Sequence, residues 1–249
     1  MIHVGTSGWQ YRDWKGSFYP EDLPQRAWLG FYTTRFSTVE LNNSFYRLPE
    51  AGTFDRWRRE TPEGFVMTVK ASRFITHLKR LREPKDPVDL LWERATELGP
   101  RLGPVLFQLP PRFAADPDRL AGLLQVLPAR MRAAFEFRDP SWHTPAVFEL
   151  LDRAGSALVW ADRPRARIDL PVTGGWAYLR FHQGQTHVPG YRKEKLRRWA
   201  DRIARIEAGE GWIYFNNDRG GAAPRDAIAL CSLLRERGVR TADPKPDRR

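Results

Sequence analysis

The sequence predicts one α/β domain folded as a single (β/α)8 TIM-like barrel, and three observations support this fold class. The chain has 249 residues, about the length that one such barrel requires. Short apolar runs alternate with stretches of helical periodicity along the chain, without an internal linker or low-complexity segment. Residues 5–8 read GTSG and lack the G-x-G-x-x-G turn of a doubly wound dinucleotide-binding sheet. We therefore expect a barrel domain over residues 1–240 and a polar C-terminal tail over residues 241–249.

Eight short apolar runs are the expected strands. Their first residues lie roughly 20 to 40 residues apart, which leaves room for a strand, a crossover helix and two loops. The expected strands cover residues 2–6, 38–42, 65–70, 104–109, 133–138, 157–162, 176–182 and 212–216.

The helices expected between these strands show one apolar face each. Four leucines recur at helical spacing in residues 118–127, and residues 195–206 place apolar side chains on one face and arginines on the other. Pro224 stands where a first helical turn would begin, and Gly238 stands just past the end of that helix.

The composition limits the class of protein. Hydrophobic residues make up 41% of the chain, which is typical of a globular domain. One cysteine excludes an internal disulfide and a multi-cysteine zinc site. The chain has no apolar run long enough to span a membrane and no secretory signal pattern, so we expect a soluble cytoplasmic protein. The formal net charge of +11 comes from 34 arginines and 7 lysines against 30 acidic residues.

Polar residues gather at the C-terminal ends of the expected strands, where barrel enzymes place their active sites. Side chains alternate along a strand, so residues of one parity point into the barrel. The inward row begins with small or apolar residues and ends with charged ones. Burying these charges is costly unless they pair, so they form either a salt-bridge network that closes the barrel or a ligand site. We expect a ligand site.

Two groups of candidate site residues follow, drawn from the strand ends and from the loop after the third strand. The candidate catalytic residues are Glu40, Glu136, His182 and Asp218. The candidate substrate-binding residues are Asn42, Lys70, Arg73, His77, Gln108, Arg138, Asp162, Arg180 and Asn216.

Three segments carry most of the positive charge. Residues 73–85 hold five basic residues and one acidic residue, residues 163–169 have a net charge of +2, and residues 192–207 hold seven basic and three acidic residues. The first two lie on loops at the expected mouth of the barrel, and the third begins there. A basic mouth attracts anions. A further loop, residues 183–190, is rich in glycine and glutamine and could act as a mobile lid.

Several sequence motifs, in order along the chain, resemble the YecE-like family of domains of unknown function. The motifs are VGTSGWQY at residues 4–11, WKGSFYP at 14–20, FSTVELNNSFYR at 36–47, VKASRFITH at 69–77, GPVLFQLPP at 103–111, EFRDPSW at 136–142 and YFNND at 214–218. The resemblance covers residues 2 to about 236. It implies a TIM-like barrel and no established reaction.

Three functions fit this pattern of residues. The first is binding of a phosphate-bearing or other anionic ligand, with nucleic acid and hydrolysis of a phosphodiester as one form of it. A divalent metal could assist, although no H-x-H or H-E-x-x-H spacing occurs. The second is a barrel that binds an anion or a protein without catalysis. The third is a glycosidase-like hydrolase, with Glu40 and Glu136 on either side of a sugar.

Overall fold

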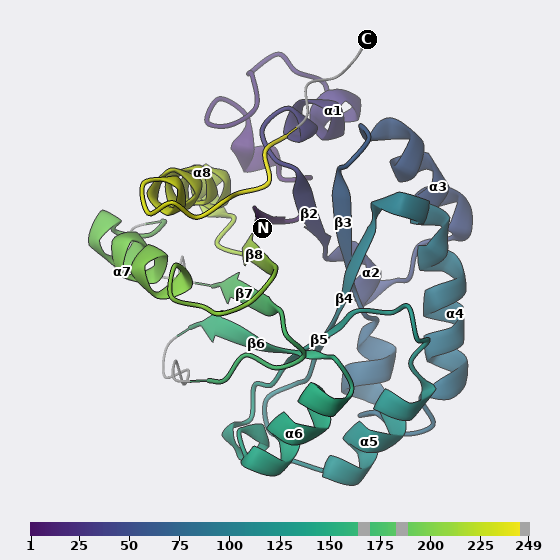
Figure 1. Ribbon diagram of the computed structural model, residues 1–249. Coiled ribbons are helices and arrows are strands. Elements are labelled where there is room, and N and C mark those ends of the chain that lie inside the picture. The colour runs from purple at the N-terminus through teal and green to yellow at the C-terminus, as the bar shows by residue number, and fades with distance from the viewer. Residues whose placement is uncertain (164–169, 183–188, 245–249) are drawn as a thin grey trace.

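The computed structural model describes residues 1–163, 170–182 and 189–244, and within them the chain forms a closed barrel of eight parallel strands (Figure 1). The strands follow one another around the barrel in chain order, and β8 pairs with β1 to close it. The predicted fold class is confirmed. The strands are β1 (Ile2–Ser7), β2 (Thr38–Leu41), β3 (Val66–Lys70), β4 (Leu102–Gln108), β5 (Ala133–Glu136), β6 (Ala157–Asp162), β7 (Ala177–Phe181) and β8 (Gly211–Phe215).

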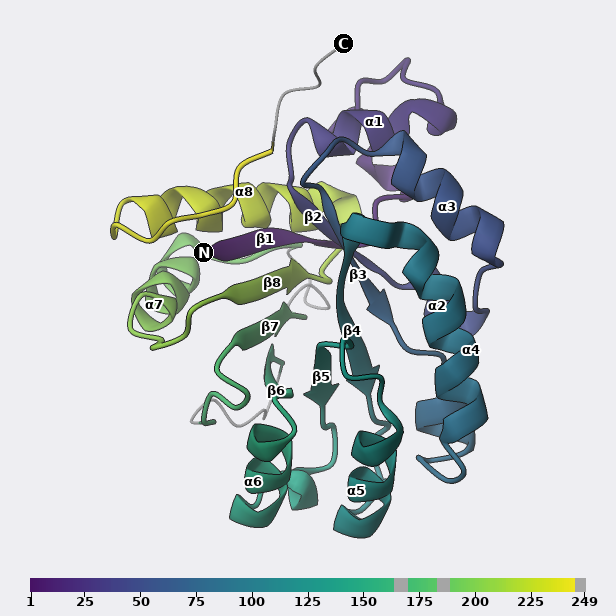
Figure 2. The ribbon, with the colours of Figure 1, turned by 45° about the vertical axis from the view of Figure 1, so that its right-hand side comes forward.

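Helices surround the strands on the outside (Figures 1 and 2). The α-helices are α1 (Trp28–Thr33), α2 (Asn43–Tyr46), α3 (Ala51–Glu60), α4 (Lys85–Ala95), α5 (Pro117–Val126), α6 (Pro145–Arg153), α7 (Lys193–Ile203) and α8 (Ala222–Arg235). Short 3-10 helices cover Arg12–Trp14, Gln25–Ala27, Thr96–Arg101, Pro140–Trp142 and Arg219–Gly221, and a π-helix covers Phe74–Leu78. Within the described residues no helix follows β6.

Local sequence explains where two of these helices begin. The Asp116 carboxylate accepts a hydrogen bond from the Arg119 amide at the start of α5, and Pro117 occupies the first turn. The Thr144 hydroxyl accepts one from the Val147 amide in α6. Such caps satisfy amides that have no partner inside the helix, and proline is tolerated in a first turn because its missing N–H is not needed there.

The alternation of side chains along the strands produces two hydrophobic cores. The larger core lies between strands and helices. The smaller core fills the inside of the barrel and consists of Leu106, Ala134, Ala157, Val159, Trp176, Tyr178, Trp212 and Tyr214. Above the smaller core, Tyr214 shares its hydroxyl with the hydroxyls of Thr38 and Thr68 at 2.7 Å each. These bonds show that Thr38, Thr68 and Tyr214 point into the barrel, on the same side of their strands.

The aromatic loop after β1 is part of the structural core. Trp14 and Tyr19 are buried, and Tyr19 stacks on Trp28 with ring centroids 4.9 Å apart. The Trp14 indole donates a hydrogen bond to the backbone carbonyl of Asp218, 2.8 Å away. This bond ties the loop after β1 to the loop after β8, so these rings pack in the protein and do not form a stacking platform for a ligand.

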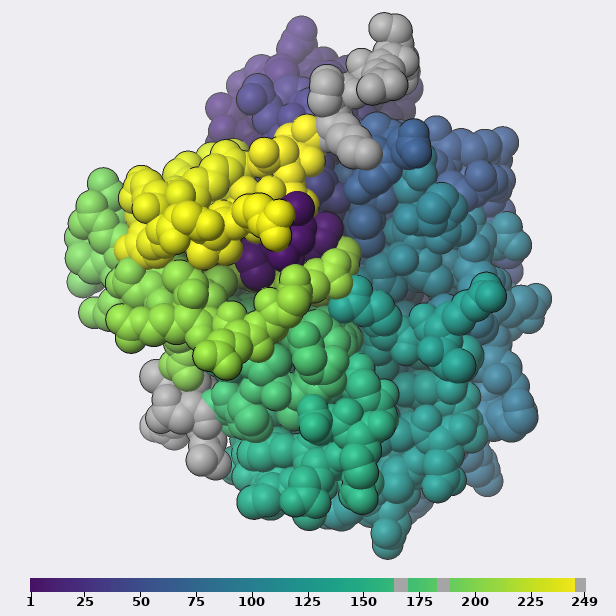
Figure 3. All heavy atoms as spheres, viewed as in Figure 1, coloured from purple at the N-terminus to yellow at the C-terminus, as the bar shows by residue number. Residues whose placement is uncertain are grey.

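The first strand and the last described residues lie side by side on one face of the molecule. Figure 3 shows the first residues packed between α8 and the segment that leads into β8. Ile2 bridges to Thr241, and the Ala242 amide donates to the Ile2 carbonyl at 2.8 Å. The residues just after 240 are therefore attached to the barrel. Among the described helices, none combines the length and the apolar character that crossing a membrane demands.

Candidate functional site

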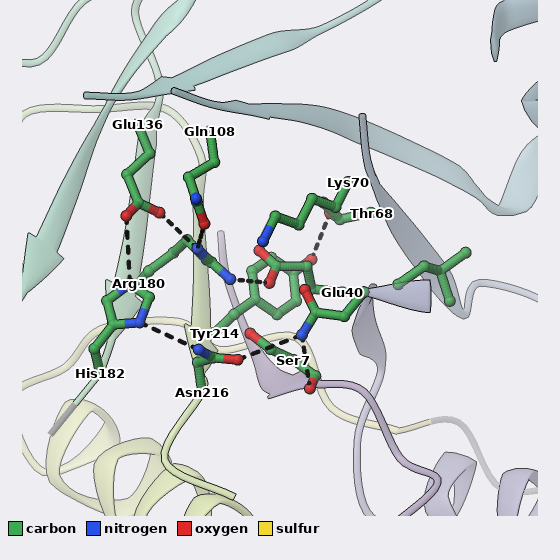
Figure 4. A network of polar contacts seen from close by, with 12 residues as sticks. Ser7, Glu40, Thr68, Lys70, Gln108, Glu136, Arg180, His182, Tyr214 and Asn216 are labelled. Carbon is green, nitrogen blue, oxygen red and sulfur yellow. Dashed lines mark hydrogen bonds and ion pairs between the residues drawn. The ribbon is translucent and has the colours of Figure 1, made fainter. Parts of the chain in front are cut away.

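A buried arginine is the centre of the polar cluster at the carboxyl ends of the strands (Figure 4). Arg180 on β7 is 1% exposed. Its Nη2 donates to Glu40 Oε1 on β2 at 2.7 Å, and its Nη1 donates to Glu136 Oε2 on β5 at 2.5 Å. The same Nη1 lies 3.3 Å from Gln108 Oε1 at the end of β4. One guanidinium thus joins side chains from three other strands.

Further donors surround the two carboxylates. Arg138, just after β5, donates from Nε to Glu136 Oε1 and from Nη2 to Gln108 Oε1, both at 3.1 Å. The Tyr178 hydroxyl donates to Glu40 Oε2 at 2.6 Å. Hydrogen bonds from charged donors are among the strongest in proteins, so both carboxylates are held firmly in place.

Both carboxylates are ionised at neutral pH. Burial by itself would raise the pKa of Glu40 and Glu136, since it disfavours the charged form. Arg180 and the other cations and hydrogen-bond donors around the two carboxylates together outweigh burial, so the pKa of Glu40 is lowered and that of Glu136 lies well below its ordinary value. Neither group is a proton donor near pH 7.

A chain of amide and imidazole groups extends from Glu136 to β1. His182 Nε2 lies 3.6 Å from Glu136 Oε1, and the Asn216 amide donates to His182 Nδ1 at 3.2 Å. Asn42 Nδ2 in turn lies 3.3 Å from Asn216 Oδ1 and 3.2 Å from the Ser7 carbonyl. Burial lowers the pKa of His182 despite the nearby Glu136 carboxylate. A neutral His182 that accepts at Nδ1 carries its proton on Nε2, facing Glu136.

Lys70, the last residue of β3, is a buried lysine that pairs with no carboxylate of the described residues. It is 8% exposed, and its Nζ lies 4.1 Å from the centre of the Phe45 ring. No carboxylate oxygen of the described residues lies within 4 Å of this amine, although Figure 4 shows the side chain extending toward Glu40. Burial, and then the positive charge of Arg180, lower the pKa of Lys70 to about 7. We call Glu40, Lys70, Glu136, Arg138 and Arg180 the ionic layer.

The loop after β3 brings His77 to the edge of the ionic layer. Its ring packs edge-on against Phe45, with centroids 4.9 Å apart, and its Nδ1 lies 2.9 Å from the Thr76 hydroxyl. Burial, together with the positive charge of Lys70, lowers the pKa of His77 to about 4. Arg73 from the same loop is exposed.

Most of the predicted site residues therefore converge. The structure groups Glu40, Asn42, Lys70, Gln108, Glu136, Arg138, Arg180, His182 and Asn216 at one end of the barrel, with His77 beside them.

Two predicted site residues lie elsewhere. Asp162 does not point into the barrel. Its neighbour in the sheet is Phe181, which belongs to the outer core, and its carboxylate accepts from the Tyr191 hydroxyl at 2.5 Å and pairs with Lys195 of α7 at 2.8 Å. Asp218 lies beside Tyr11 and Asp13, at the side of the ionic layer, and burial raises its pKa.

Three groups at the site were missing from the candidate residues. The Ser7 hydroxyl lies beside Glu40, Tyr178 bonds that carboxylate, and Phe45 packs under Lys70. Alternation along the first strand, in which Ile2 and Val4 face the outer core, could have placed Ser7 inside. Phe45 comes from α2, and the sequence gives no signal for its contact with Lys70.

The basic segments are only partly at the mouth. Residues 192–207 form mainly α7, which packs on the outside of the barrel. Arg163 donates to the Phe137 carbonyl at 2.9 Å, whereas residues 164–169 and most of the expected lid, 183–188, lie outside the described residues.

The described residues do not form a metal-binding group. Across residues 1–163, 170–182 and 189–244, no three His, Cys, Asp or Glu side chains are arranged to hold an ion. The Glu40 and Glu136 carboxylates share the Arg180 guanidinium instead, so the protein itself supplies a positive charge beside them.

Comparison with known proteins agrees with the fold and its family. The chain is 27% identical to the UPF0759 protein YunF of Bacillus subtilis (strain 168), over 94% of this chain and 95% of that protein. A DUF72 family protein from Thermotoga maritima is 29% identical, with a TM-score of 0.83, over 94% of this chain and 99% of that structure. One from Enterococcus faecalis has 18% identity and a TM-score of 0.81 over the whole of both chains, which shows likeness of fold.

A sugar epimerase has the same type of fold at greater distance. D-psicose 3-epimerase from Clostridium cellulolyticum, solved with D-tagatose, is 11% identical with a TM-score of 0.63, over 96% of this chain and all of that one. The family described as "Protein of unknown function DUF72" matches residues 3–249, while the YecE-like name stays a resemblance. The chain therefore belongs to the DUF72 family.

Proposed function

We propose that the barrel binds a small ligand bearing a phosphate or carboxylate group at the ionic layer. One observation carries this proposal, namely that the buried Lys70 amine lacks an acidic partner among the described residues. Glu40 and Glu136 balance Arg138 and Arg180 in charge, so a protonated Lys70 leaves one positive charge in excess. Buried charges are costly unless they are paired, and a ligand anion would supply the missing charge.

Some residues of the ionic layer position other side chains of the protein, and others are available to contact a ligand. Both Nη atoms of Arg180 bond carboxylates or Gln108, so this arginine positions the protein's own side chains. Arg138 has a side chain that is 31% exposed, and its Nη1 makes no hydrogen bond within the described residues. Lys70 and Arg138 are therefore the groups that would contact the anion, and Arg73 stands at the rim to attract it.

His182 is the proton carrier in an enzymatic form of this proposal. Glu40 and Glu136 remain ionised, which makes them unsuitable as the general acid of a glycosidase. Neutral His182 could accept a proton from a bound hydroxyl or water at Nδ1, in place of its hydrogen bond from Asn216, and the Glu136 carboxylate would stabilise the resulting imidazolium. The phosphodiester form uses the same groups, with nucleic acid as the ligand.

Calorimetric titration with inorganic phosphate tests the proposal. We expect wild-type protein and Lys70→Arg to bind phosphate, and Lys70→Met to bind it at least tenfold more weakly, a difference of about 1.4 kcal/mol. Lys79→Met is the matched control, because Lys79 pairs with Glu83 on the surface at 2.7 Å. Equal binding by wild type and Lys70→Met would refute the role of Lys70. A labelled oligonucleotide tests the nucleic-acid form, whose affinity should fall steeply between about 50 and 200 mM salt.

A further inference from the structure

The surroundings of Lys70 favour a free amine and differ from those of three described lysines that pair with carboxylates. Lys79, Lys85 and Lys195 each pair with a carboxylate, at 2.7, 2.6 and 2.8 Å respectively. Lys70 has no carboxylate within 4 Å among the described residues, and it is 8% exposed with Arg138 and Arg180 near it. Its contact with the Phe45 ring, 4.1 Å away, favours the ammonium form. Burial and neighbouring cations both disfavour the ammonium form. A lysine in such surroundings is activated as a nucleophile.

Building on the proposed anion site, we infer that Lys70 captures the carbonyl group of an anionic aldehyde or ketone as an imine. The anion of such a substrate would lie on Arg138 while its carbonyl carbon faces Lys70 Nζ. The ligand class thereby narrows from any small anion to a carbonyl compound that carries a phosphate or a carboxylate.

The chemical step balances without an oxidant, a reductant or a metal. The Nζ lone pair attacks the carbonyl carbon, and the electrons of the C=O double bond move to oxygen. A proton passes from nitrogen to that oxygen, a second proton comes from solvent, and water leaves as the C=N bond forms. The products are one protonated imine and one water.

The ionic layer suits the product of this step. A protonated imine keeps the single positive charge that Lys70 carries as an ammonium, so the balance with the ligand anion is unchanged. Glu40 and Glu136 act on Lys70 from β2 and β5, and their charges favour the cationic imine. Arg180 from β7 and Arg138 act in the opposite sense and favour the neutral amine before the reaction.

His77 completes the set of titratable groups around this amine. It packs on the same Phe45 ring as Lys70 and is neutral at pH 7, because burial and the charge of Lys70 lower its pKa to about 4. His77 therefore adds no charge that would hold Lys70 as an ammonium. A pKa of about 7 leaves part of the Lys70 population as the free amine near pH 7.

Reductive trapping on the whole protein tests the inference. The probe is pyridoxal 5′-phosphate, an aldehyde with a phosphate group, with sodium cyanoborohydride to fix any imine, followed by peptide mapping of the seven lysines. At pH 7 we expect labelling at Lys70 to be at least tenfold faster than at Lys85, and slower in the presence of inorganic phosphate. Lys70→Arg should bind phosphate and lose this label, whereas Lys79→Arg should keep it.

The outcomes separate this inference from the proposed function. Phosphate binding by wild type together with no excess label at Lys70 overturns the imine and leaves the anion site standing. Fast labelling of Lys70 by both pyridoxal phosphate and uncharged propanal, without protection by phosphate, supports the amine and overturns the anion site. A comparison of total labelling rates gives a further test. If wild type and a folded Lys70→Arg variant are both labelled only at the rate of surface lysines, the imine is overturned.

Discussion

Replacing Arg180 by methionine should destabilise the protein strongly, because this side chain is the shared partner of two buried carboxylates. Glu40 and Glu136 are fully buried, and Arg180 bonds them at 2.7 and 2.5 Å. Removing one partner of a buried ion pair costs about 3–5 kcal/mol, since it leaves an uncompensated charge. We therefore expect Arg180→Met to lower the free energy of unfolding by about that amount at pH 7.

The pH dependence makes this expectation sharper. In the folded wild type, Arg180 helps to lower the pKa of Glu40 and Glu136 below the ordinary value of 4.5. The stability that these two carboxylates contribute is therefore fully present above pH 4.5, and it is lost as the pH falls through their pKa values in the folded protein. In Arg180→Met burial acts unopposed by this cation and raises the pKa of both groups. The variant then gains relative stability on acidification, and its deficit should shrink between pH 7 and pH 4.

Urea unfolding followed by circular dichroism at both pH values measures these differences. Arg56→Met is the matched control, because Arg56 lies 3.9 Å from Glu60 in an exposed pair worth at most about 1 kcal/mol. The triple variant Arg180→Met, Glu40→Gln, Glu136→Gln should recover part of the loss by removing the unpaired charges. A deficit below about 1 kcal/mol at pH 7, or one that grows toward pH 4, would refute the reasoning.

Three further predictions follow from single contacts. Affinity for sulfate, an anion whose charge stays constant from pH 6 to 9, should fall as the pH rises through about 7, because Lys70 loses its proton there; titrations over this range measure the change, and an affinity that is constant or increases would contradict the assignment. Tyr214→Phe should cost about 1–3 kcal/mol in thermal unfolding, since the Thr38 and Thr68 hydroxyls lose their shared partner; an unchanged melting temperature would show that they find another. Asp162→Asn should lower stability yet leave phosphate affinity within twofold in the same titration, because Asp162 faces α7, and a larger change in affinity would place it at the site.

Strand parity predicted much of the site, because it decides which residues share a face. On β2 and β7 apolar residues alternate with polar ones, and the inward assignment of Glu40 and Arg180 was right. On β6 both faces are apolar, with Val159 inside and Trp160 outside, so alternation alone could not show to which side Asp162 points. The register between β6 and β7 shows the side, because Ala161 is the neighbour of the inward Arg180 and Asp162 is the neighbour of the outward Phe181.

The properties that give the site its chemistry depend on distances that a sequence does not contain. The sequence placed Lys70 at a strand end beside acids and arginines, where either an ion pair or an unpaired amine was consistent with the pattern. In the structure, Phe45 from α2 packs against the amine, and the two carboxylates bond both Nη atoms of Arg180. Lys70 is therefore left without an acidic partner among the described residues.

The distribution of positive charge favours a small ligand over a polyanion. The whole chain has a net charge of +11. Within the ionic layer, the two carboxylates offset the two arginines, so the net charge is the single positive charge of a protonated Lys70. Residues 192–207, one of the three strongly basic segments, form mainly α7 on the outside of the barrel, where Lys195 pairs with Asp162. A polyanion would need many unpaired cations along one surface, whereas one phosphate or carboxylate group is enough to neutralise Lys70. We therefore expect phosphate binding to survive at salt concentrations that abolish any binding of oligonucleotides.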